Sequence, residues 1–249
     1  MSVALTHDRE GVTVHTMSPI HQGGPVYYAS LPRDTETRQG HRTNAEEVRH
    51  LLVSTLWDHL AAMEIPLWKH CQSPGRTPVP IQLACGLLGR PHLQVGKFRG
   101  PAISFSEGGG KVWAALCGDE SDIGIDVAGS DEFQGDYPFQ RVFHLEELQH
   151  ALRLADEDSE EAAALLWSVK EAVVKALGCG FHFVDPRSIH VYPSPGRTGG
   201  GYSFPVGLSG KALERFPAAA GRSLRVRSLP QGKSWFSVAL VKRSPAVHE

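Results

Sequence analysis

The stretch DSEEAAALLWSVKEAVVKALG, residues 158–178, has the pattern of a single long amphipathic helix. Its apolar residues recur every three or four positions, which gathers them on one face at about 100° per residue. Asp158 and Glu161 fit a capping box at the start, and Gly178 is a typical helix stop. We expect the apolar face to form the core contact; its members are Ala162, Leu165, Leu166, Val169, Ala172, Val173, Ala176 and Leu177.

A second stripe on this helix carries Trp167, Glu171 and Lys175, spaced four residues apart. Each step of four turns by only about 40°, so the stripe is narrow and lies nearly opposite the core face. An exposed Glu–Lys pair at this spacing is worth about 0.2–0.5 kcal/mol and needs no function. The tryptophan favours a covered stripe, because a large ring rarely lies fully in solvent. A covered glutamate and lysine need partners, which a bound cation and a bound anion would supply.

The segment SDIGIDVAG, residues 121–129, has the alternation of a strand. Asp126 would lie on the same side as Gly124, whose missing side chain leaves room for something bulky. Alone, the pattern also fits an ordinary half-buried strand. With Glu171, however, Asp126 offers the hard oxygen ligands that Mg²⁺ uses, and Lys175 would add a point charge for phosphates. The two faces of the strand are Ile123, Ile125 and Val127 on one side and Asp122, Gly124 and Asp126 on the other.

In each half of the chain, the sequence predicts a helix followed by strands. The first helix is expected from Asn44, where Asn44 and Glu47 form a capping box. This order favours an α+β fold over alternating strands and helices, with one unit over residues 1–117 and another over 118–249. The GGG runs at 108–110 and 199–201 lack the following helix that a phosphate loop requires. Strand-like segments cover 11–17, 25–31, 111–117, 121–129, 188–193, 201–208, 223–229 and 235–241.

The composition excludes several functional classes. Twenty-five Lys and Arg against 27 Asp and Glu give a net charge of −2, which argues against broad nucleic-acid binding. The four cysteines have no zinc-site spacing and are expected to be reduced thiols. No secretory signal pattern, membrane span or heptad repeat is evident. We therefore expect a cytoplasmic monomer.

Two motifs resemble the signature of a known family. GIDV at 124–127 and WSVKEAVVKALG at 167–178 are similar to the strand and helix motifs of the 4′-phosphopantetheinyl transferases, in their long, surfactin-synthetase-activating type. GRP at 89–91 resembles the Gly-Lys-Pro motif of that family, with Arg90 in place of lysine. AISFS at 102–106 resembles a further segment of the family. The order and spacing of all four segments agree.

The resemblance implies a fold of two similar α+β halves related by a pseudo-two-fold axis, with the cofactor cleft between them. It implies transfer of the 4′-phosphopantetheine group from coenzyme A to a serine hydroxyl of an apo carrier protein. The reaction would depend on Mg²⁺ and release adenosine 3′,5′-bisphosphate. Coenzyme A and an acyl or peptidyl carrier protein are the expected partners; the sequence does not indicate which pathway the carrier serves.

The resemblance also implies roles for individual residues. Asp126 and Glu171 would bind Mg²⁺, and Glu171 would also act as the base for the serine. Lys175 would hold the pyrophosphate as a second catalytic group, and Trp167 would shape the site. Arg42, just before the first helix, is either a ligand of the 3′-phosphate or a solvated loop residue. The residues expected to bind coenzyme A are Arg42, Arg90, Ser104, Lys170 and Lys175.

Two departures from the family pattern keep other functions open. Phe105 replaces a frequent histidine, and Ala128 replaces a frequent second acidic residue, for which Glu107 is a possible substitute. One alternative is a degenerate protein that binds coenzyme A or a carrier protein without catalysis. Another is a different Mg²⁺-dependent phosphoester enzyme, such as a hydrolase.

Overall fold

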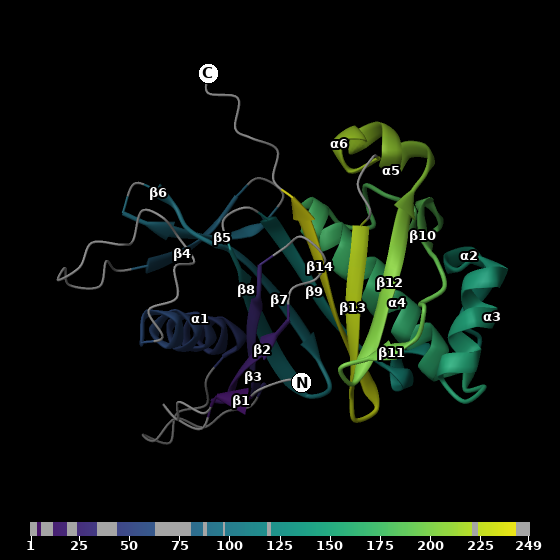
Figure 1. Ribbon diagram of the computed structural model, residues 1–249, viewed down its shortest axis with the longest axis horizontal. Coiled ribbons are helices and arrows are strands. Elements are labelled where there is room, and N and C mark those ends of the chain that lie inside the picture. The colour runs from purple at the N-terminus through teal and green to yellow at the C-terminus, as the bar shows by residue number, and fades with distance from the viewer. Residues whose placement is uncertain are drawn as a thin grey trace. The chain divides into compact units, whose positions relative to one another are not determined.

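The computed structural model describes residues 4–5, 12–18, 24–33, 44–62, 81–86, 89–96, 98–118, 121–220 and 224–242 (Figure 1). The chain divides into two compact units, Met1–Asp119 and Glu120–Glu249, called unit 1 and unit 2 below. In the described residues, unit 1 combines β-strands with one long helix and unit 2 combines a sheet with several helices, so the predicted α+β class is confirmed. The pseudo-two-fold relation between two similar halves stays a prediction.

Unit 1 has an antiparallel sheet with one long helix, α1 (Ala45–Ala62), packed against β3 and β8. The helix begins as its sequence predicts, because Asn44 and Glu47 exchange backbone-to-side-chain hydrogen bonds of 2.9 and 3.0 Å. Its own residues Val48, Leu52 and Leu56 are fully buried. The sheet order is β1 (Ala4–Leu5), β2 (Val14–Met17), β3 (Val26–Pro32), β8 (Lys111–Cys117) and β7 (Ala102–Gly108).

Strand β7 and a small second sheet were not foreseen. The strands β7 and β8 form a hairpin whose turn residues, Gly109 and Gly110, have φ angles of 60° and 71°. Positive φ at both central positions defines a type I′ turn, which glycine adopts without strain. The first GGG run is thus a hairpin turn. The second sheet joins β4 (Ile81–Cys85), β5 (Pro91–Val95) and β6 (Phe98–Arg99).

Unit 2 contains a larger antiparallel sheet, in which β9 pairs with β14 over its whole length. The turn between β11 and β12 uses Gly199 and Gly200, with φ angles of 52° and 81°, so the second GGG run is also a hairpin turn. The strands are β9 (Ser121–Gly129), β10 (Ile189–Val191), β11 (Arg197–Thr198), β12 (Gly201–Leu208), β13 (Leu224–Gln231) and β14 (Ser234–Lys242).

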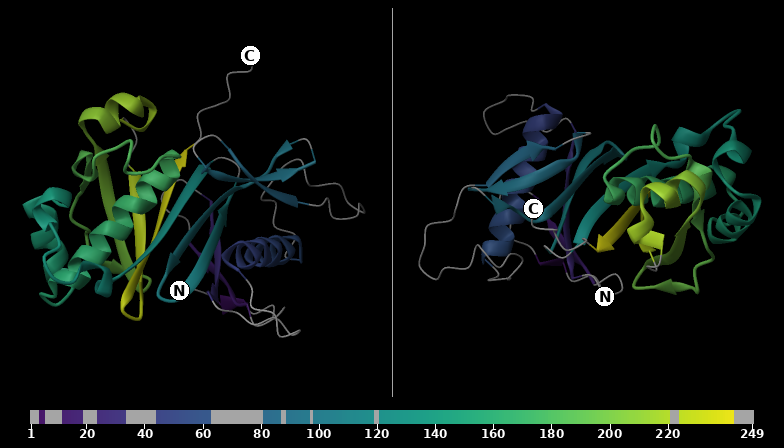
Figure 2. Two further views of the ribbon diagram at one scale, coloured as in Figure 1. Left: turned by 180° about the vertical axis from the view of Figure 1, so that it is seen from behind. Right: turned by 90° about the horizontal axis from the view of Figure 1, so that it is seen from above.

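The central helix of unit 2 is α4 (Ser159–Leu177), which lies across the sheet against β9, β14 and β13 (Figure 2). Its other side packs against α3, so it is buried on more than one face, as the tryptophan on its second stripe indicated. Among the described helices, none is both long and apolar enough to span a membrane. The remaining helical segments are η2 (Ser130–Phe133), α2 (Phe139–Val142), α3 (Leu145–Leu154), η3 (Pro186–Ser188), α5 (Gly210–Arg215) and α6 (Pro217–Ala220).

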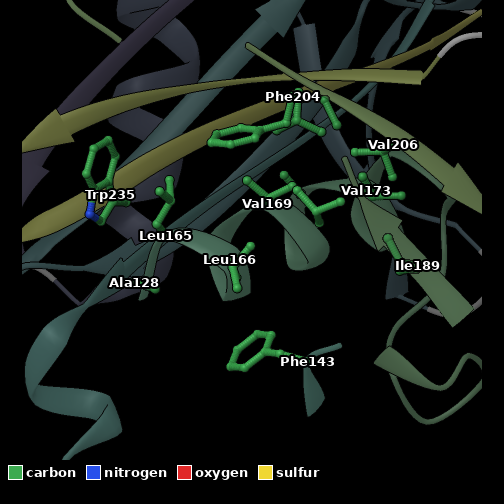
Figure 3. Packing of buried hydrophobic residues seen from close by; sticks show 14 of the residues in the cluster. Ala128, Phe143, Leu165, Leu166, Val169, Val173, Ile189, Phe204, Val206 and Trp235 are labelled. Atoms are coloured by element: carbon green, nitrogen blue, oxygen red, sulfur yellow. The ribbon is translucent and has the colours of Figure 1, made fainter. Parts of the chain in front are cut away.

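The core of unit 2 forms around α4 (Figure 3). Leu165, Val169 and Val173 point from the helix toward the sheet, where Phe204 and Trp235 are buried. Burying each large apolar side chain contributes roughly 1.5–3 kcal/mol, so this packing fixes the helix firmly on the sheet. The position of α4 therefore decides where its polar side chains lie.

Candidate functional site

The sequence-predicted residues Asp126, Glu171 and Lys175 come together where α4 crosses β9. The Lys175 Nζ lies 2.6 Å from Asp126 Oδ1 and 3.9 Å from Glu171 Oε2. The side chains are 9%, 23% and 30% exposed for Asp126, Glu171 and Lys175, so the cluster is mostly buried but open to solvent. We refer to these three residues as the acidic–lysine cluster.

Gly124 brings the helix close enough to form this cluster. A Cβ atom at Gly124 would lie 2.0 Å from the Ala172 carbonyl oxygen and 2.3 Å from the Ala176 amide nitrogen. No side chain fits there, and the backbone of α4 fills the space beside Asp126. The sequence predicted room for something bulky at this position, and the helix itself occupies it.

The ends of α4 are held by local sequence signals. Asp158 accepts a hydrogen bond of 2.8 Å from the Glu161 amide and caps the first turn. Gly178 ends the helix with a left-handed φ of 81°, and its amide donates to the Lys175 carbonyl. The cation of Lys175 thus lies in the last turn, where the helix dipole favours positive charge.

The stripe that begins at Trp167 is covered, as its sequence suggested. The Trp167 ring packs 4.9 Å from the Phe181 ring and 6.5 Å from the Phe133 ring, measured between centroids. Phe181 follows the end of α4, and Phe133 lies in η2 after β9. Aromatic residues from both flanking segments therefore cover Trp167, which lies one helical turn before Glu171.

Burial and neighbouring charges both act on the carboxylates of the acidic–lysine cluster. Burial raises the pKa of Glu171; Lys175 opposes this and the neighbouring Asp126 adds to it. Within these three residues one ammonium accompanies two carboxylates, so their charges sum to one negative charge when all three are ionised. A further cation beside Asp126 and Glu171 would offset that negative charge.

The donor set fits a magnesium ion. Two carboxylates from a rigid strand and a rigid helix are ligands of the type Mg²⁺ prefers, and this ion normally keeps several waters or takes phosphate oxygens. The negative charge of the three residues supports the same fit. Lys175 would then be available to an anion, because its present partner is one of those carboxylates.

The sequence offered Glu107 as a third protein carboxylate, in place of the acidic residue missing at Ala128. Ala128 is 1% exposed and packs in the apolar core of unit 2 (Figure 3). Glu107 lies in unit 1 and pairs with Arg49 at 2.9 Å and Arg33 at 3.8 Å. Glu107 thus has cationic partners within unit 1, and its role as a metal ligand stays a prediction.

Lys170 does not point toward the acidic–lysine cluster. Its side chain is 0% exposed, and its Nζ lies 2.9 Å from Glu147 Oε2. It also donates to the carbonyl oxygens of Ile189 at 2.8 Å and Pro186 at 3.0 Å. With its donors so occupied, Lys170 is not available to coenzyme A; this corrects the cofactor-binding role that the motif suggested.

Glu147 is the partner that sequence reasoning missed. Besides Lys170, its carboxylate accepts backbone hydrogen bonds from His144 at 3.0 Å and Val191 at 2.8 Å. The signal in the sequence was the position of Glu147 three residues after His144, which marks the start of a helix. That signal says nothing of burial, so its pairing with Lys170 could not be foreseen.

Glu147 also belongs to a group with His144 and His190, whose potential ligand atoms lie within 4.8 Å of one another. The two rings stack with centroids 4.4 Å apart and planes 14° apart, and the Nε2 atoms of His144 and His190 already form hydrogen bonds of 2.8 Å with the Arg187 carbonyl and the Ser209 hydroxyl. A divalent cation there would also face the buried ammonium of Lys170. This group therefore fits a metal less well than the acidic–lysine cluster does.

The other predicted site residues lie outside unit 2. Ser104 is buried on β7, and Arg90 is half-buried just before β5. Phe105 is half-buried beneath the Arg49 guanidinium, whose carbon lies 5.7 Å from the ring centroid. Arg42 lies outside the described residues, so its predicted contact with a phosphate stays a prediction.

Comparison with known proteins identifies the segment that carries the cluster. Residues 122–209 match the family model of the 4′-phosphopantetheinyl transferase superfamily. No curated protein matches the chain. Among solved structures, the ACPS–CoA complex of Chronobacterium ammoniagenes is 20% identical, covers 50% of this chain and 98% of its own, and has a TM-score of 0.41. The segment of the chain that carries Asp126, Glu171 and Lys175 is thus similar to the 4′-phosphopantetheinyl transferase superfamily.

Proposed function

We propose that this protein transfers the 4′-phosphopantetheine group of coenzyme A to a serine hydroxyl of an apo carrier protein and releases adenosine 3′,5′-bisphosphate. The proposal includes a requirement for Mg²⁺. The observation that carries it is the convergence of Asp126, Glu171 and Lys175, from a strand and a helix, inside the segment that matches the family.

Each side chain has a role that its surroundings support. Asp126 and Glu171 would hold Mg²⁺, which when bound offsets negative charge on the pyrophosphate. Lys175 would leave Asp126 and bind a pyrophosphate oxygen, since an ammonium is a compact point charge for phosphate. Burial raises the pKa of Glu171, which makes its carboxylate a stronger base toward the serine hydroxyl.

The reaction balances without another reactant. The serine oxygen forms a bond to the β-phosphorus of coenzyme A, and the bond from that phosphorus to the bridging oxygen breaks. The serine proton passes to Glu171, directly or through a water molecule. The leaving adenosine 3′,5′-bisphosphate carries away the negative charge, which fixed cations stabilise in the transition state.

Mass spectrometry of a carrier protein tests the proposal. The protein is incubated with coenzyme A, Mg²⁺ and a panel of apo carrier proteins, and a carrier that gains one phosphopantetheine group supports transfer. Release of phosphopantetheine without gain of mass on any carrier would favour the hydrolase instead. Binding of coenzyme A with no turnover of either kind would favour a non-enzymatic binding protein.

Variants of the cluster link the activity to these residues. Glu171→Gln and Lys175→Ala should each lower kcat by about 100-fold or more, because charge stabilisation of this kind contributes about 10²–10³-fold. Glu214→Gln and Lys211→Ala, on the exposed helix α5, are matched controls and should keep wild-type activity. Near-wild-type turnover by either cluster variant at saturating Mg²⁺ would refute the assignment.

A further inference from the structure

A buried anchor holds α4 on the side away from β9. The ammonium of Lys170 is surrounded by Glu147 of α3 and by the backbone carbonyls of Pro186 and Ile189, and more distantly by that of Val142 at 3.4 Å. Lys170 is among the largest fully buried side chains described. One side chain thus ties α4 to four separate segments of unit 2.

The charge of this anchor follows from its partners. All four oxygen atoms around Lys170 Nζ are acceptors, and only the ammonium has enough N–H groups to serve three of them at once. Burial lowers the pKa of Lys170, while the carboxylate of Glu147 opposes that effect. The hydrogen bonds therefore favour the ionised pair.

A buried ion pair of this kind contributes little to the free energy of unfolding, but it can determine the orientation of the helix that carries it. Removing two charges from water costs about as much as their attraction returns, so replacing a buried pair with neutral groups is often harmless to stability. The hydrogen bonds from Lys170 to the carbonyls of Pro186 and Ile189, by contrast, form together only when α4 has one rotation about its axis and one position along it. The anchor is therefore suited to setting the orientation of α4.

That orientation decides where Glu171 and Lys175 lie. Lys170 directly precedes Glu171, so the two side chains leave the helix about 100° apart. On one side Gly124 sets how deeply α4 lies on β9; on the other Lys170 fixes its rotation. The Lys175 Nζ lies 2.6 Å from Asp126 Oδ1, and a small rotation of α4 would separate these two atoms.

We propose that Lys170 and Glu147 are positioning residues, which hold α4 in the rotation that brings Glu171 and Lys175 to Asp126. They touch neither coenzyme A nor metal. The inference rests on the proposed function for its effect on transfer, but its structural content is independent of activity.

The double variant K170M/E147Q tests the inference. It removes both charges together, so no unpaired ion is left buried, and the glutamine can still accept from the Val191 amide. Because the carbonyls of Pro186 and Ile189 lose a donor, we expect the urea midpoint to fall, by an amount comparable with that of Val226→Ala. We also expect kcat to fall about 10–100-fold, as misplacement of about 1 Å can cost 100-fold, while the KM for coenzyme A changes less than threefold.

Two readouts separate positioning from a merely structural role. Calorimetry with Mn²⁺ and coenzyme A should show metal affinity about tenfold weaker than in wild type, and a crystal structure of the variant should show the Lys175–Asp126 contact lengthened beyond hydrogen-bond distance. Val226→Ala, which opens a cavity on β13 in the same unit, controls for lost stability and should keep the wild-type kcat.

The outcomes decide the inference in each case. A folded double variant with the wild-type kcat, Mn²⁺ affinity and Lys175–Asp126 distance overturns it. If the double variant does not fold, Glu147→Asp takes its place: it keeps the charge but shortens the anchor, and the same readouts apply. A wild-type protein without transfer activity would refute the proposed function alone, since the Lys175–Asp126 distance still tests the anchor.

Discussion

Gly124→Ala tests whether the close approach of α4 to β9 creates the site. The added methyl group would lie 2.0 Å from the Ala172 carbonyl oxygen and 2.3 Å from the Ala176 amide nitrogen. Both are backbone atoms, so no side-chain rotation relieves the overlap. The helix would have to move away from the strand.

The size of the effect follows from these distances. Ordinary contact requires a separation of about 3.2 Å or more, so α4 must shift by about 1 Å. Overpacking of a well-packed core costs about 1–3 kcal/mol, and the rigid backbone places this substitution near the upper limit. A displacement of about 1 Å at a catalytic group can cost about 100-fold in rate. We therefore expect the free energy of unfolding to fall by about 3 kcal/mol and kcat to fall about 100-fold.

Urea unfolding and the carrier-modification assay measure the two effects. Gly118→Ala is the control, because a Cβ at Gly118 would meet nothing within 4 Å. It should leave both quantities near their wild-type values. If Gly124→Ala keeps wild-type stability and turnover, the contact between α4 and β9 does not determine the site, and the reasoning is wrong.

Two further predictions concern stability. Glu157 has a left-handed φ of 65° in the turn between α3 and α4. Glycine adopts this conformation without strain, so Glu157→Gly should raise the free energy of unfolding by about 0.5–1 kcal/mol in urea titrations. A lower free energy of unfolding would show that the Glu157 side chain stabilises the fold by more than its strained backbone destabilises it. Burial, and then the neighbouring His144, lower the pKa of His190 below its ordinary 6.5. The charges of Lys170 and Arg187 also lower this pKa, and the carboxylate of Glu147 raises it. Because unfolded His190 then binds more protons than folded His190, acidification below about pH 6.5 should reduce stability, and His190→Gln should lessen this reduction between pH 7 and pH 5.5; an identical reduction in both proteins would contradict the assignment.

Many elements of unit 2 could be predicted because their signals are local. The cap at Asp158, the stop at Gly178 and the helical spacing between them fixed the limits of α4 to within a residue. Alternation identified β9, and the WxxKE-type motif singled out Glu171 and Lys175. By contrast, β7 was missed, because residues 102–106 were compared with a family motif and the glycines after them were not recognised as a hairpin turn.

The sequence by itself determined the α+β class, the limits of the main helices and the three residues of the acidic–lysine cluster. These depend on periodicity, caps and residue types, all of which act over a few neighbouring positions. Only the tertiary structure decided that the backbone of α4 fills the space beside Asp126, and that Lys170, one residue from Glu171, points away from the cluster to Glu147. The direction of a side chain on a helix that is buried on several faces depends on partners far away in the chain, and no local pattern encodes which of them it meets.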